Sequence, residues 1–133
     1  MADADVSSVT GGYEQGLALA RAGDYFEAHE EFERAWRACE PEERDFFQGL
    51  VHVVVSAYQS GRGKPVAAER QRLKALHRLA AFEPVHRGLD VELLRAKLDR
   101  AEADPREHLV ERDAQPPVAV EEQQQAEDDQ RPA

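Results

Sequence analysis

The fold of this 133-residue chain is decided by the stretch Gly23-Asp24-Tyr25-Phe26-Glu27-Ala28-His29-Glu30-Glu31-Phe32-Glu33-Arg34-Ala35-Trp36. Gly23 closes the helical pattern before it, and Asp24 with Glu27 three residues later forms a capping pattern that starts a new helix. The pattern predicts a helix from Asp24 to about Cys39. At about 100° per residue, one narrow stripe of this helix faces inward, and it contains Tyr25, His29, Phe32 and Trp36.

Four further helices are predicted around this one, over residues 13–22, 41–60, 65–82 and from Asp90 onward. Pro41 and Pro65 each suit a first helical position. The helix over 41–60 is apolar nearly all round, which is typical of a central helix. The inward side of the helix over 65–82 is predicted to hold Val66, Leu73, Leu76, His77 and Ala80. Short connections predict an all-α fold, a compact bundle of about five antiparallel helices with the third helix central.

Composition divides the chain into three parts. Residues 1–10 are small and unpatterned, and we expect a frayed N-terminus there. Residues 11–112 form a single helical domain, since about 100 residues sustain one core. From Asp113 the composition turns to Gln, Pro, Glu and Asp, which predicts an acidic, disordered tail over 113–133.

The charge and the apolar runs limit the partners. A net charge of −10 is unlike a nucleic-acid-binding protein, which usually has a basic patch, and it is unsuited to an anionic membrane surface. No apolar stretch approaches the roughly 18 residues of a membrane span. Cys39 is the single cysteine, so no disulfide forms within the chain. We therefore expect a cytoplasmic protein that binds neither nucleic acid nor membrane.

The residues that could carry chemistry lie around His29 and Glu33, an i, i+4 pair whose side chains reach one point beside the helix. One interpretation is structural: His29 hydrogen-bonds Glu33, and Arg44 or Gln48 of the next helix satisfies the remaining polar atoms. This would be an interhelical network without chemistry. Glu30 is expected at its rim.

A second interpretation is catalytic. His29 and Glu33 would be ligands of a divalent metal and Glu30 the general base, with His52 or His77 as a third ligand, since a catalytic zinc has three protein ligands. A proton-transfer role and a small-ligand pocket between the second and third helices also remain open. An apolar strip around Val51 and Val55 suggests a homodimer. His86 and His108 are expected at the surface.

These residues also carry a resemblance. The blocks over 23–36 and 43–51 resemble a small bacterial and archaeal family called domain of unknown function 309, over roughly residues 13–98. Its motif falls on His29, Glu30, Glu33, Trp36, Arg44, Gln48, Gly49 and Leu50. The resemblance implies an all-helical fold and a metal-dependent hydrolase, and it adds Tyr58 to the motif network. Where the family typically has histidines late in the third helix, this chain has Tyr58 and Gln59.

Overall fold

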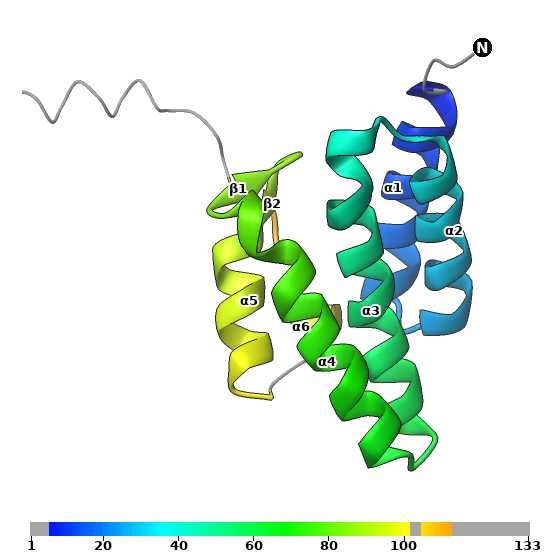
Figure 1. Ribbon diagram of the computed structural model, residues 1–133. Coiled ribbons are helices and arrows are strands. Elements are labelled where there is room, and N and C mark those ends of the chain that lie inside the picture. The colour runs from blue at the N-terminus through cyan, green and yellow to red at the C-terminus, as the bar shows by residue number, and fades with distance from the viewer. Residues whose placement is uncertain (1–5, 102–104, 113–133) are drawn as a thin grey trace, which may run out of the picture.

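The computed structural model describes residues 6–101 and 105–112 (Figure 1). Helices dominate it, so the predicted all-α class is confirmed. In chain order the elements are α1 (Val6–Arg21), α2 (Tyr25–Ala38), η1 (Pro41–Glu43), α3 (Arg44–Gly61), α4 (Pro65–Leu79), η2 (Ala80–Phe82), β1 (Val85–His86), β2 (Leu89–Asp90), α5 (Val91–Asp99) and α6 (Pro105–His108). In the described part of the chain, no helix is both long and apolar enough to span a bilayer.

Helix α3 lies in the middle, as predicted. α1 packs on α2, α2 on α3 and α3 on α4, and α5 contacts the far side of α4 (Figure 1). The core is almost entirely aliphatic and aromatic, and its largest fully buried side chains are Phe32, Phe46, Phe47, Leu50, Leu79, Leu89, Leu94 and Leu98. Each of the first four α-helices therefore packs on the next one along the chain, around a single core.

Helix α1 begins at Val6, several residues before the predicted start at residue 13. The glycines at 11 and 12 look like a helix breaker in the sequence. In the structure they are a packing device, because a Cβ on Gly12 would lie 2.6 Å from the carbonyl oxygen of Glu31. Gly12 thus lets α1 approach α2 closely, and this packing compensates for the poor helix propensity of glycine. Residues 1–5 and the predicted tail over 113–133 lie outside the described residues.

The predicted inward side of the fourth helix is wrong except at Leu76, which packs partly buried against the core; His77 and Ala80 are exposed. Val66 is 65% exposed and Leu73 is 51% exposed, while Ala75 and Leu79 are buried. Its apolar residues fall on two sides, and packing against α3 selects between them. Leu79 fills the space above Gly49, where an added Cβ would lie 2.7 Å from the Leu79 side chain.

A short hairpin joins α4 to α5, with Val85 opposite Asp90. The Asp90 side chain accepts a hydrogen bond from the backbone N–H of Leu93 (2.9 Å) and so caps α5, as predicted. The surface positions expected for His86 and His108 are wrong: His108 is 8% exposed, and the half-buried His86 ring lies 4.5 Å from the Phe46 ring.

Glu43 receives hydrogen bonds from His86 and Arg87 of this hairpin, each at 3.0 Å. Burial alone would raise the pKa of the Glu43 carboxyl, but the hydrogen bonds and charges of Arg87 and His86 together lower it. The hairpin is thereby tied to the start of α3.

Candidate functional site

The motif residues lie mainly along one open face, which we call the α2–α3 strip. Helices α2 and α3 run antiparallel there, since Trp36 meets Arg44 at one end and Phe26 meets Tyr58 at the other. None of the strip residues is fully buried, and Phe26 is 50% exposed. The strip consists of Phe26, His29, Glu33 and Trp36 on α2 with Arg44, Val51, Val55 and Tyr58 on α3.

His29 lies near the middle of the strip with a defined tautomer. Its Nδ1 lies 2.6 Å from the carbonyl oxygen of Phe26, and because a carbonyl only accepts hydrogen bonds, Nδ1 carries the proton. Nε2 is then the nitrogen with a lone pair, and it lies 3.8 Å from Oε2 of Glu33. The His29 side chain is 21% exposed and that of Glu33 is 42% exposed. The pair is therefore open to solvent.

The other end of the strip is an arginine stacked on an indole. The guanidinium of Arg44 lies 4.4 Å from the centre of the Trp36 ring, a cation–π contact. Arg44 therefore meets Trp36, and the cation beside Glu33 is Arg37 of its own helix (3.8 Å). The indole Nε1 of Trp36 is buried and has no hydrogen-bond partner.

A pocket of about 170 Å³ lies at the Phe26 end, between α2 and α3. Its lining is mostly aromatic and aliphatic: Tyr25, Phe26, His29, Val55, Tyr58 and Gln59. The buried Oε1 of Gln59 has no hydrogen-bond partner. Phe26 and Gln59 were not predicted as site residues. Phe26 precedes His29 by three residues and Gln59 follows Val55 by four, and this helical spacing was the available signal.

The remaining predicted residues lie elsewhere. Glu30 is exposed. Gln48 faces α4, in a hollow with His52 and His77, and Nδ1 of His52 donates to Oε1 of Gln71 on α4 (2.7 Å). The structure thus brings together His29 with Glu33 and Trp36 with Arg44, and it separates Gln48 from both pairs. Among residues 6–101 and 105–112, no three His, Cys, Asp or Glu side chains converge as metal ligands.

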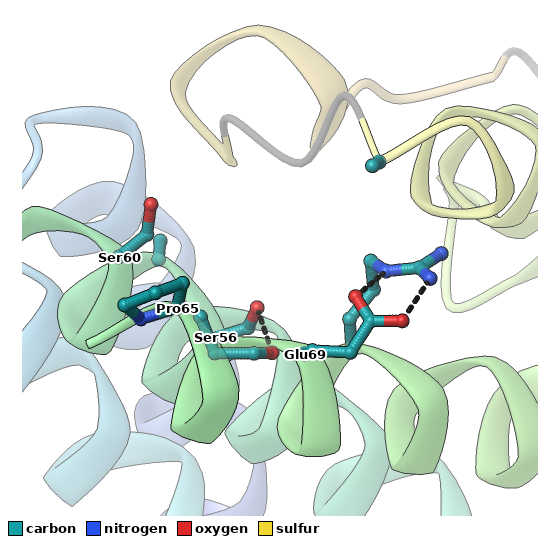
Figure 2. Close-up of a pocket in the computed structure, with 8 residues that line it drawn as sticks. Ser56, Ser60, Pro65 and Glu69 are labelled. Atoms are coloured by element: carbon teal, nitrogen blue, oxygen red, sulfur yellow. Dashed lines mark hydrogen bonds and ion pairs between the residues drawn. The ribbon is translucent and has the colours of Figure 1, made fainter. Parts of the chain in front are cut away.

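The crevice of about 210 Å³ between α3 and α4 is a weaker candidate (Figure 2). Ser56 donates to the carbonyl oxygen of Ala68 (2.8 Å), and Glu69 binds Arg72 through two hydrogen bonds. The Ser56 bond crosses from α3 to α4, whereas Glu69 and Arg72 pair within α4, so these polar groups already have partners. Cys39 is also a weak candidate for chemistry, because burial raises the pKa of its thiol and so disfavours the reactive thiolate.

The fold is therefore all-α, and its helices α2 and α3 form an antiparallel pair with one face partly exposed to solvent. Residues 13–71 match the family model of a domain of unknown function, DUF309, which supports the resemblance seen in the sequence. The matched segment runs from α1 into α4 and so contains the whole α2–α3 strip. A comparison with curated proteins found no match.

Proposed function

We propose that this protein is an interaction module that self-associates through the α2–α3 strip. The observation that carries the proposal is the placement of the motif residues His29, Glu33, Trp36, Arg44 and Tyr58 along an open face instead of in the sealed core. Aromatic side chains with polar edges, such as Trp36 and Tyr58, are enriched in interfaces because they bury much area while keeping a hydrogen-bonding end. The half-exposed Phe26 adds an apolar group that a partner would cover.

The size of the pocket supports a side chain as its occupant. Small-molecule sites usually measure about 300–1,000 Å³, whereas this pocket measures about 170 Å³. That volume suits one apolar side chain of a partner. The interface would then have an anchor residue in a pocket, surrounded by polar groups.

The charges of α2 favour a second copy of this chain as the partner. The exposed residues of its first half include Glu27 and Glu30, and those of its second half include Arg37, followed by Arg44 at the start of α3. In a two-fold symmetric pair with antiparallel α2 helices, the acidic half of one copy faces the basic half of the other. Glu30 then lies opposite Arg37 of the other copy.

Two matched substitutions test the proposal. Phe26 and Val66 are each the second residue of a helix, and each is at least half exposed. An aspartate at either site therefore meets the same helix dipole and disturbs little packing. We expect the wild-type protein and Val66→Asp to sediment as dimers and Phe26→Asp as a monomer. A wild-type monomer at about 100 μM, or a dimer that Phe26→Asp leaves intact, would overturn self-association here.

A second candidate rests on the tautomer of His29. A histidine that ligates a metal usually donates its other N–H to a carbonyl or carboxylate, and Nδ1 of His29 has such a partner in Phe26. His29 and Glu33 thus supply two ligands, fewer than the three protein ligands of a catalytic zinc. A second copy on the strip would supply the others. Bound zinc would polarise a substrate or activate a water.

Calorimetric titration with ZnCl₂ tests this second candidate. The wild-type protein should bind about one zinc ion per two chains, and His29→Asn should not. His77→Asn is the matched control, because His77 is an exposed histidine on α4. Equal binding by all three proteins would remove His29 as a ligand and leave the self-association proposal untouched.

A further inference from the structure

Helix α4 is basic on a chain that is strongly acidic. Between residues 70 and 78 it contains no acid and five basic side chains, while the whole chain has a net charge of −10. The basic side chains are Arg70, Arg72, Lys74, His77 and Arg78. This local reversal of charge makes the surface of α4 attractive to anions.

Three of these side chains line one hollow against α3. It measures about 370 Å³, and its lining is Gln48, His52, Leu73, Lys74, His77 and Arg78. The lining residues carry cations, imidazoles and one amide, and no carboxylate. Asp45 lies beside the hollow and binds one guanidinium nitrogen, Nη1, of Arg78 (2.6 Å). The remaining N–H donors of that guanidinium are left for another acceptor.

We propose that this hollow between α3 and α4 is a binding site for a small phosphate monoester. The Lys74 ammonium and the Arg78 guanidinium supply charged donors to the phosphate oxygens, with Gln48 and His77 as further donors. Leu73, which is 51% exposed, offers an apolar wall to the organic part of the ligand. The volume lies within the usual range for small-molecule sites. This inference is independent of self-association, because the hollow lies on the α4 side of α3.

His52 couples the site to pH. Burial, together with the charges of Arg78 and Lys74, lowers the pKa of its imidazole, although the hydrogen bond with Gln71 works in the opposite direction. The polar groups around it are Gln71, Lys74, His77 and Arg78 from α4 and Gln48 from α3. Asp45 of α3 acts through its ion pair with Arg78. An anion in the hollow offsets the two cations, so binding favours protonation of His52, and a dianion binds more tightly as pH falls.

The experiment titrates the full chain with sodium sulfate and follows backbone amide NMR signals at constant ionic strength maintained with chloride. Sulfate keeps its double charge from pH 5.5 to 8, so a change in affinity with pH reports on the protein. We expect saturable shifts at residues 48, 52 and 73–78, and an affinity several-fold higher at pH 5.5. Lys74→Gln should weaken binding about three- to tenfold, while Lys64→Gln, at the N-cap of α4 and outside the hollow, should not.

A titration with phenyl phosphate tests whether the hollow prefers a phosphate monoester to inorganic phosphate. It should bind several-fold more tightly than inorganic phosphate to the wild-type protein, and this preference should disappear in Leu73→Ser. Equal weakening by Lys74→Gln and Lys64→Gln, or shifts spread over the whole surface, would show unspecific charge attraction and overturn the site. Saturable sulfate binding with no preference for phenyl phosphate would overturn the ester and leave an inorganic anion.

Discussion

The two sides of helix α3 differ in how their polar atoms are satisfied. Toward α4, Ser56 and His52 bind groups of the neighbouring helix at 2.8 and 2.7 Å. Toward α2, the cation beside Glu33 is Arg37 of its own helix, and Nε1 of Trp36 and Oε1 of Gln59 are buried without hydrogen bonds.

The polar atoms between α3 and α4 are therefore hydrogen-bonded across the helices, whereas some on the α2–α3 strip are not. Buried polar groups in folded proteins are nearly always hydrogen-bonded, so cross-helix bonds such as His52 to Gln71 are typical of a structural seam. Unpaired atoms such as Nε1 of Trp36 mark a face whose packing is incomplete within one chain. We infer that the α3–α4 seam holds the fold together and that the α2–α3 strip serves binding. Substitution of a residue at the α3–α4 seam should therefore lower stability more than substitution of a matched residue on an open surface.

Leu79→Ala should have the largest effect on stability. Leu79 is fully buried against Gly49, and truncating a buried leucine costs about 2–5 kcal/mol of unfolding free energy. Leu73→Ala, on the same helix but 51% exposed, should cost less than about 1 kcal/mol. Urea denaturation of both variants measures the two costs, and equal costs would mean that α4 packs on a different side.

The two histidines of the contrast should differ in the same way. His52→Ala removes the partner of Gln71 at the seam and should lower the unfolding free energy by about 1–3 kcal/mol. His29→Ala on the strip should lower it by less than about 1 kcal/mol, because His29 bonds a carbonyl of its own helix. Thermal denaturation of both variants at one pH checks the pair. A larger loss for His29→Ala would make the strip structural.

Gly49→Ala should be destabilising although alanine favours helix. The new Cβ would lie 2.7 Å from the Leu79 side chain, and overpacking of this kind costs about 1–3 kcal/mol against a gain of about 1 kcal/mol in helix propensity. Gly61→Ala, at the end of the same helix, meets nothing within 4 Å and should be neutral or slightly stabilising. The urea midpoints of the two variants should therefore move in opposite directions.

The smallest effect concerns pH. Burial is the main reason why the pKa of the His52 imidazole in the folded protein lies below its ordinary value of 6.5. Below about pH 6.5 the unfolded chain therefore binds the proton first, and the free energy of unfolding falls until the folded-state pKa is reached. The loss cannot exceed about 1.4 kcal/mol per pH unit. Denaturation at pH 7.5 and 5.5 should show it in the wild type and in His29→Gln, and less of it in His52→Gln.

Much of the helical framework could be predicted because its boundaries are marked by single residues. Gly23 precedes α2, Pro65 begins α4 and Asp90 caps α5, each acting within one turn of its own helix. These are local effects of backbone geometry and capping. Helix boundaries that depend on residues within one turn can therefore be predicted from a single sequence.

The side to which each helix turns could not be predicted in the same way. Helical phase groups Tyr25, His29, Phe32 and Trp36 into one stripe, but of these only Phe32 is fully buried, because no other element within residues 6–101 and 105–112 covers the α2–α3 strip. The two-residue strands that end at Asp90 are too short to show a period of two. The bond from His86 to Glu43 spans 43 residues and leaves no trace in local pattern.

A charge exchange on the strip tests the central claim most directly. Sedimentation equilibrium would give the dimer dissociation constants of the wild type, Glu30→Arg, Arg37→Glu and the double variant. If two copies meet with antiparallel α2 helices, each single variant places like charges opposite each other and weakens the dimer about tenfold, and the double variant restores wild-type affinity. A double variant at least as weak as both single variants, or a wild-type protein that stays monomeric, would contradict the account.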